Sequence, residues 1–256
     1  MLAKHFLKSI ARNSNLIIVS SYDSRKDLLS VVPEWESKIR VLQFVSEIKD
    51  IPDSSNFEII KEKYGLKGEK YFIITNQFWK HKNHQIVLES LLLLKQRGAI
   101  PFKIVATGKT SDTRDIQYTN KLFCYIKEHH LENDFLALGE IPYIDVLSLI
   151  IGSLAVIQPS LFEGWNTSVE ECKSIGKKLI LSDIAIHREQ NPDNVIFFDP
   201  YSKEMLAAIL NDVYHTYNDE AEYKMQQLGI LASSERWGSF SENYLNIVSE
   251  LISENN

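Results

Sequence analysis

Two glutamates separated by seven residues stand out in the stretch Q-P-S-L-F-E-G-W-N-T-S-V-E-E, residues 158–171. An apolar run leads into this stretch, a turn containing glycine follows, and the polar residues 166–168 offer three alternative caps for a helix. Glu163 then lies in the turn and Glu171 in the first helical turn. If the apolar run is a parallel strand, both carboxylates face one cleft, because open α/β sheets bind ligands beyond the carboxyl ends of their strands.

A structural role explains the same acids equally well when spacing alone is considered. Thr167-x-x-Glu170 and Ser168-x-x-Glu171 both fit the capping box, in which an acid three residues into a helix bonds to a free backbone N–H group. The choice between a helix cap and a ligand site therefore depends on the surrounding elements.

Apolar strands alternate with amphipathic helices along the chain. The predicted strands are residues 16–20, 40–45, 71–75, 102–107, 135–138, 154–158, 178–182 and 195–198. The predicted helices are residues 85–97, 115–130, 143–151, 167–175 and 203–214. Short strands that are apolar on both faces, with helices between them, predict an α/β fold: a Rossmann-like parallel sheet with helices on both faces.

The chain divides into unequal parts. Residues 46–55 are polar, contain a proline and are predicted to be a linker. Before it, residues 1–45 hold one helix, one strand, a short helix and one strand, too little for a domain. After it, residues 56–239 hold about six strands, enough for a complete domain. Residues 240–256 repeat apolar side chains at helical spacing and predict a final amphipathic helix.

Composition excludes several functions. The 28 basic and 34 acidic residues give a net charge of −6, which argues against nucleic-acid binding. Cys124 and Cys172 form neither a disulfide framework nor a metal spacing, so a reducing cytoplasm is expected. The basic, amphipathic residues 1–12 fit a packed helix better than a membrane-surface helix, although a peripheral place at the inner membrane face stays open. The pairs His81/His84 and His129/His130 lack a third ligand nearby, so no metal is expected.

Several blocks, in order and at consistent spacings, resemble the C-terminal half of the group 1 family of retaining glycosyltransferases. That family has the GT-B architecture, in which two Rossmann-like domains face each other across a cleft for the sugar donor. The blocks are residues 71–84 (Y-F-I-I-T-N-Q-F-W-K-H-K-N-H), 102–109, 135–142, 158–171, 176–189 and 197–200, with Trp237 before the final helix. The resemblance covers nearly the whole chain.

The resemblance implies a role for individual residues. The E-x7-E motif maps onto Glu163, which would contact hydroxyls of the transferred sugar, and Glu171, which would contact the ribose. Lys82 matches the basic residue that neutralises the diphosphate as the glycosidic bond breaks. Lys82 and Glu163 are therefore the expected catalytic residues, and no metal or other cofactor is required. The other expected donor-binding residues are Gly108, Lys109, Gly139, Glu140, Ile141, Ser160, Gly164, Trp165, Asn166 and Thr167.

The sequence departs from the family pattern at two positions. Gln77 stands where many members carry an arginine, so the diphosphate charge falls more heavily on Lys82 or on nearby Lys80. Asn166 stands in place of a glycine, and asparagine tolerates the left-handed backbone that glycine permits. Residues 183–189 are predicted to be a polar loop whose side chains form a structural hydrogen-bond network.

The function that follows from the resemblance is sugar transfer with retention, from a nucleotide-diphospho-sugar to a glycan, lipid-linked or small-molecule acceptor. Nothing in the chain matches the glycine-rich loop of the N-terminal domain. Three alternatives follow: a truncated glycosyltransferase, one subunit of a split enzyme whose N-terminal half is a separate chain, or a nucleotide-sugar-binding module without activity. The first two predict an exposed apolar patch where residues 1–45 and 240–252 meet their partner. A nucleotide-sugar 2-epimerase is the remaining alternative.

Overall fold

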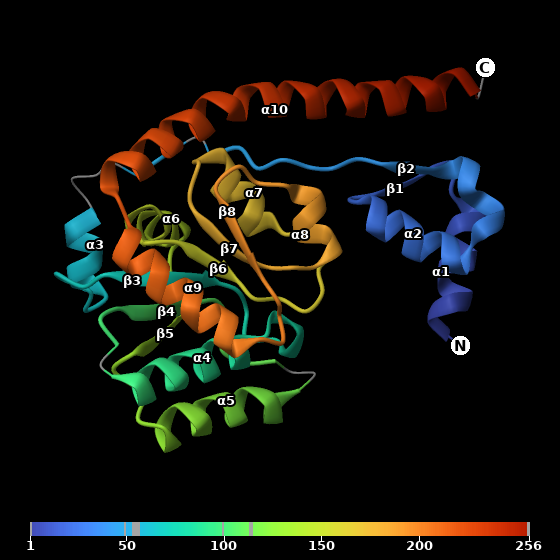
Figure 1. Cartoon of the computed structure of the whole chain (residues 1–256). Coiled ribbons are helices and arrows are strands. Elements are labelled where there is room, and N and C mark those ends of the chain that lie inside the picture. The colour runs from blue at the N-terminus through green and yellow to red at the C-terminus, as the bar shows by residue number, and fades with distance from the viewer. Residues whose placement is uncertain (1, 49, 53–56, 99, 113–114, 255–256) are drawn as a thin grey trace.

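The computed structural model describes residues 2–48, 50–52, 57–98, 100–112 and 115–254 (Figure 1). Its main feature is a six-stranded parallel sheet with the strand order β5-β4-β3-β6-β7-β8. The strands are β3 Tyr71–Thr75, β4 Lys103–Thr107, β5 Phe135–Gly139, β6 Val156–Gln158, β7 Leu179–Ser182 and β8 Val195–Phe198. Every strand predicted for this sheet is present, within two residues at each end.

Helices cover both faces of this sheet, as the apolar strands require. One layer consists of α4 His84–Arg97, α5 Ile116–Glu128 and α9 Lys203–Thr216, packed over the side chains of the largest core cluster. The other face carries α3 Phe57–Lys63, α6 Tyr143–Gly152 and α7 Thr167–Ser174, with a second core cluster beneath them. The predicted α/β fold with a covered parallel sheet is confirmed.

Residues 2–41, called the N-terminal unit below, lie beside the large sheet. This unit consists of α1 Leu2–Asn13, β1 Ile17–Val19, α2 Tyr22–Val31, the 3-10 helix η1 Pro33–Lys38 and β2 Ile39–Val41. The two strands pair in parallel over a small core of Ala11, Val32 and Ile39. The second strand ends four residues before its predicted end, because residues 42–48 leave the sheet as an extended segment.

The predicted linker, residues 46–55, is described only in part. Residues 46–48 and 50–52 contain no helix or strand, as expected for a connection, and residues 49 and 53–55 lie outside the described part of the chain. The division of the chain at this segment stays a prediction.

Two helices differ from their predictions. The final helix, α10, spans Asp219–Glu254 and is 36 residues long, so it begins well before residue 240. Residues 183–189 are not simply a loop, because α8 occupies Ala185–Gln190. The described helices include none that is both long enough and apolar enough to cross a bilayer.

A close contact between two glycines brings α10 against the segment between α7 and β7. Gly229 lies against the backbone of Gly176, and a Cβ added at Gly229 would come within 2.2 Å of the Gly176 nitrogen. Near the other end of the helix, Glu250 Oε2 accepts a hydrogen bond of 3.0 Å from Nε of Arg40 in β2. The helix thus connects the part of the chain that contains the large sheet with the N-terminal unit (Figure 1).

Candidate functional site

The order of the sheet strands reverses between β3 and β6, which are neighbours in the sheet although two strands separate them in the chain. The segments that follow these two strands diverge, and a cavity of about 210 Å³ opens between them. Such a reversal is the usual ligand-binding position of an open α/β sheet. The residues that line the cavity are Thr75, Asn76, Gln77, Trp79, Lys82, Glu163, Trp165, Asn166, Thr167 and Ser168.

An ion pair joins the two sides of this cavity. Lys82 Nζ lies 2.5 Å from Oε1 of Glu163, and the side chains are only 13% and 8% exposed. Lys82 ends the 3-10 helix η3, Lys80–Lys82, which follows β3. Lys80, the alternative cation in the prediction, is exposed and lies outside the cavity lining. The cavity therefore contains a cation and a carboxylate that partly shield each other from water.

The amino end of α7 also lies at the cavity. Asn166 is the N-cap, and its Oδ1 accepts a hydrogen bond of 3.3 Å from the backbone N–H of Val169. Thr167 and Ser168, which follow the cap, line the cavity, so the positive end of the helix is available to an anion. The two predicted capping boxes do not form, because both place the cap one or two residues too late.

The two motif glutamates do not share the cavity lining. Glu171 lies in the second turn of α7 rather than the first, and its Oε1 accepts a hydrogen bond of 2.8 Å from the Tyr143 hydroxyl. Burial raises the pKa of Glu171, and the hydrogen bond from Tyr143 offsets part of this rise. The acid is therefore half-buried with one oxygen occupied, and its predicted contact with a ribose stays a prediction.

Gly108 and Gly139 shape the backbone at the carboxyl ends of β4 and β5. Gly108 has φ +112°, and a Cβ there would lie 2.6 Å from the Asn76 carbonyl oxygen. Its N–H donates a 2.8 Å hydrogen bond to the Gly139 carbonyl. Lys109 and Glu140 beside them are exposed, whereas Ile141 packs against the core. All five residues lie at the same sheet edge as the cavity but outside its lining.

The turn between β6 and α7 forms two hydrogen bonds with the N-terminal part of the chain. Ser160, also in this turn, is fully buried and is not among the residues that line the cavity. The indole N–H of Trp165 donates a 2.9 Å hydrogen bond to the Phe44 carbonyl, which fastens the extended segment to the turn. The Gly164 carbonyl accepts a 3.3 Å hydrogen bond from the Ser20 hydroxyl in the N-terminal unit.

Two buried amide side chains at the cavity, those of Asn76 and Gln158, were not predicted. Asn76 Nδ2 donates a 2.6 Å hydrogen bond to Gln158 Oε1, and Gln158 Nε2 donates to Thr75 Oγ1 at 3.1 Å. Gln158 also accepts a 3.3 Å hydrogen bond from Asn166 Nδ2. The available signal in the sequence was a polar residue at or just after the end of each apolar strand.

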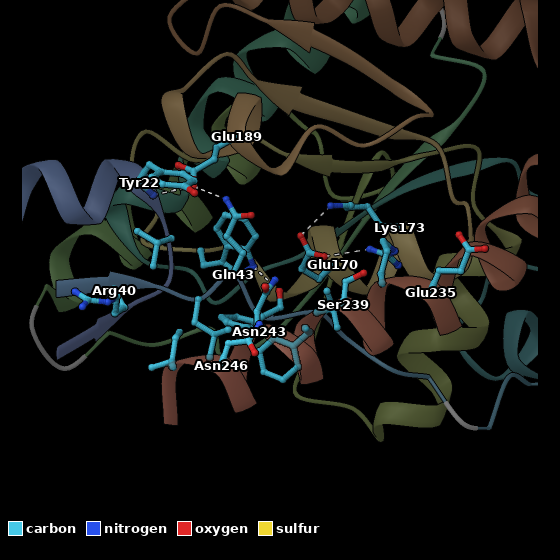
Figure 2. A pocket seen from close by; sticks show the side chains of 18 of the residues that line it. Tyr22, Arg40, Gln43, Glu170, Lys173, Glu189, Glu235, Ser239, Asn243 and Asn246 are labelled. Carbon is cyan, nitrogen blue, oxygen red and sulfur yellow. Dashed lines mark hydrogen bonds and ion pairs between the residues drawn. The ribbon is translucent and has the colours of Figure 1, made fainter. Parts of the chain in front are cut away.

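A larger cavity of about 630 Å³ lies between α10, the extended segment 42–45, and helices α7 and α8 (Figure 2). Most of the charged side chains that line it form ion pairs or hydrogen bonds with one another. Glu170 contacts Lys173 at 3.3 Å and Arg236 at 3.2 Å, while Glu189 accepts a 2.6 Å hydrogen bond from Gln43. These contacts hold α10, α7 and the extended segment together. We therefore interpret this cavity as part of the packing interface between these elements.

No metal centre is evident in the described residues: they contain no group of three His, Cys, Asp or Glu side chains placed to hold an ion. His84 is fully buried and stacks on Phe78 with ring centroids 4.3 Å apart. The expectation that no metal is required stays a prediction.

Comparison with known proteins identifies the family. The family described as glycosyl transferases group 1 matches residues 56–227. The O-antigen chain mannosyltransferase RfbU of Salmonella typhimurium is 20% identical over 211 residues, which are 82% of this chain and 54% of that protein. This chain thus spans about half the length of that curated relative.

Solved structures show the same fold. A glycosyltransferase from Rickettsia africae ESF-5 superposes with a TM-score of 0.80 and 20% identity, over 97% of this chain and 67% of the other. Anabaena Alr3699/HepE in complex with UDP-glucose gives a TM-score of 0.78 and 17% identity, over 98% of this chain and 68% of the other. The expected likeness to C-terminal domains of the GT-B architecture is confirmed. The chain belongs to the group 1 glycosyl transferase family.

Proposed function

We propose that this chain is the donor-binding half of a retaining glycosyltransferase that takes a hexosyl-type sugar from a nucleoside-diphospho-sugar. The observation that carries the proposal is the Lys82–Glu163 pair, which lies at the strand-order reversal and beside the amino end of α7. Crystals of Anabaena Alr3699/HepE, which has the same fold, contain UDP-glucose, and this supports a nucleotide sugar as the ligand.

The proposed chemistry uses each charge of the cavity. The Lys82 ammonium and the backbone N–H groups at the start of α7 neutralise the diphosphate that leaves when the glycosidic bond breaks, so no metal is needed. Glu163 accepts hydrogen bonds from hydroxyls of the transferred sugar, which charged carboxylates do well. Without a ligand Lys82 is paired with Glu163, so an incoming diphosphate competes with Glu163 for the ammonium.

We also propose that the N-terminal unit completes its sheet with further strands, supplied by a longer chain or by a separate chain. Among the described residues, β1 and β2 pair only with each other, and two three-residue parallel strands are too few for a stable parallel sheet. Ile18 in β1 is 46% exposed, and Leu245 in α10 is 61% exposed. This exposed apolar surface supports a missing partner rather than a stand-alone binding module.

Calorimetric titration tests ligand binding. The chain is titrated with UDP, GDP, ADP and dTDP and with their glucose and mannose conjugates, alongside Glu171→Ala. We expect one nucleotide to bind and the substitution to weaken its binding. Binding of none of them would contradict the proposal, and an unchanged affinity in Glu171→Ala would show that Glu171 does not contact the ligand.

Product analysis tests the reaction class. The chain is incubated with the nucleotide sugar that binds, with and without an N-terminal GT-B domain added as a separate chain. We expect little turnover by the chain alone. When the active site is completed, we expect released nucleoside diphosphate, with the sugar transferred to an acceptor hydroxyl or, where no acceptor is added, slowly to water. Epimerised sugar nucleotide in place of released nucleotide would assign the chain to the epimerases instead.

A further inference from the structure

A layer of polar side chains, most of them buried, lies at the candidate cavity. Thr75, Gln158 and Ser182 end the three neighbouring strands β3, β6 and β7, and Gln158 and Ser182 are fully buried. Buried polar groups are costly unless they are hydrogen-bonded, so such a layer persists only where its members satisfy one another. Its connection to Glu163 runs through two further buried residues, Asn166 and His187.

His187 in α8 has a defined hydrogen-bonding arrangement. Its side chain is fully buried, and Nδ1 lies 2.8 Å from the carbonyl oxygen of Ser182. A carbonyl only accepts, so Nδ1 carries the proton and donates it. Burial lowers the pKa of His187, which keeps the ring neutral near pH 7. Nε2 is therefore an acceptor, and Asn166 Nδ2 lies 3.4 Å from it.

The orientation of the Asn166 amide is fixed from two sides. Its Oδ1 accepts the N–H of Val169 as the helix cap, so Nδ2 points the other way. On that side it meets acceptors only: His187 Nε2, Gln158 Oε1 at 3.3 Å and Glu163 Oε1 at 3.3 Å. A flipped amide would lose the cap and place its oxygen against these acceptors.

The two carboxylate oxygens of Glu163 therefore differ in their surroundings. Oε1 receives both Lys82 at 2.5 Å and Asn166 at 3.3 Å. Within the described part of the chain, Oε2 takes part in no hydrogen bond or ion pair. With Oε1 held by two hydrogen-bond donors, the carboxylate presents a constant oxygen to a ligand in the cavity.

We propose that His187 is a positioning residue: acting through Asn166, it orients the Glu163 carboxylate so that Oε2 accepts hydroxyls of the transferred sugar. The proposal rests on the proposed function, because it assigns Glu163 to the sugar rather than to the nucleotide. It predicts that His187 affects recognition of the sugar and not of the nucleoside diphosphate.

Two amide substitutions separate the two hydrogen bonds of His187. In His187→Gln the terminal amide reaches the place of Nε2, so an acceptor for Asn166 is kept while the bond to Ser182 is lost. In His187→Asn the shorter amide takes the place of Nδ1, so the bond to Ser182 is kept and the acceptor is lost. Thermal unfolding of both variants reports the structural cost of each change.

The test compares, by calorimetry on the full chain, the affinity for the nucleoside diphosphate with that for its sugar conjugate. We expect His187→Asn to weaken binding of the sugar conjugate about fivefold more than binding of the diphosphate, roughly the effect of one hydrogen bond. We expect His187→Gln to keep the ratio of the two affinities that the unsubstituted chain shows. The positioning role would be overturned if His187→Asn weakened binding of both ligands equally. It would also be overturned if, in both variants, the loss of affinity simply followed the loss of thermal stability.

A ligand-independent measurement separates this proposal from the proposed function. Nitrogen-15 NMR of the histidine side chains should show His187 as the neutral Nδ1–H tautomer, and an Nε2–H tautomer would overturn the network. If the unsubstituted chain binds no nucleotide sugar, the proposed function fails and the sugar-orienting role fails with it. If the chain binds and only the ratio test fails, the positioning role alone is wrong.

Discussion

Lys82 Nζ and Glu163 Oε1 lie 2.5 Å apart, and this contact joins the segment after β3 to the segment after β6. The two residues are 81 positions apart in the chain. The contact places a cation and a carboxylate in one small cavity at the point where the sheet order reverses. A ligand that carries both an anionic group and hydroxyl groups can use both partners, which is the basis of the proposed function.

Replacing Lys82 tests the anion-binding half of this pair. We expect Lys82→Ala to weaken nucleoside diphosphate binding about tenfold or more, since a charge-assisted hydrogen bond is lost. Lys80→Ala is the matched control, because Lys80 is exposed and outside the cavity lining. Calorimetry on both variants, with circular dichroism to verify folding, decides the matter. Equal effects of the two substitutions would remove Lys82 from the site.

The pH dependence of binding tests Glu171. Burial raises the pKa of this acid and the Tyr143 hydroxyl lowers it, so Tyr143→Phe should raise the pKa further. If the carboxylate accepts ribose hydroxyls, binding is lost as the pH falls through this pKa. The midpoint of that loss should therefore move to higher pH in Tyr143→Phe. Nucleotide titrations between about pH 4 and 8 measure it, and an unchanged midpoint would separate Glu171 from the ligand.

The glycine contact under α10 should control the stability of that helix. Gly229→Ala places a Cβ 2.2 Å from the Gly176 nitrogen, so we expect the free energy of unfolding to fall by about 1–3 kcal/mol. Gly238→Ala in the same helix is the control, because nothing lies within 4 Å of its added Cβ. That change should raise helix stability by about 0.5–1 kcal/mol. Urea unfolding distinguishes them, and a harmless Gly229→Ala would contradict the close contact.

Burial of His84 should make the fold sensitive to acid. Burial, and then the charge of Lys82, lower the pKa of His84 from 6.5 to about 3. Below about pH 6.5 the unfolded chain therefore binds a proton that the folded chain excludes, and stability falls on acidification. His84→Phe keeps a ring against Phe78 and removes this effect.

The comparison is the free energy of unfolding at pH 7 and at pH 5.5. From pH 7 to pH 5.5, we expect the free energy of unfolding of the parent chain to fall by about 1 kcal/mol more than that of His84→Phe. His187 titrates in both proteins, so its contribution cancels in the difference. Identical losses in both proteins would mean that His84 is accessible to protons in the folded state.

The large sheet could be predicted because its strands are short apolar runs bounded by polar turns. The run Tyr71–Thr75 occurs at the predicted residues, and its first four residues are buried, since a strand covered on both faces leaves little room for polar positions. Helix α8 was missed because it is only six residues long and its last four residues are polar. Its burial comes from tertiary packing that no periodicity of six residues reveals.

The sequence identified individual residues of the site but not the contacts between them. Lys82 and Glu163 were both expected to act on the ligand, yet nothing local indicates that they bond to each other. The N-cap role of Asn166 was one of three alternatives, and only the backbone geometry chooses it. The network through His187 depends on strand order, because it joins residues from β6, β7 and α8.

A crystal structure of this chain with the nucleotide sugar that binds it best would show directly whether the cavity holds the donor. We expect the diphosphate to lie beside Lys82 and the start of α7, with hydroxyls of the sugar within hydrogen-bond distance of Glu163. A ligand bound elsewhere, for example in the larger cavity along α10, with the Lys82–Glu163 pair left intact and uncontacted, would contradict this expectation.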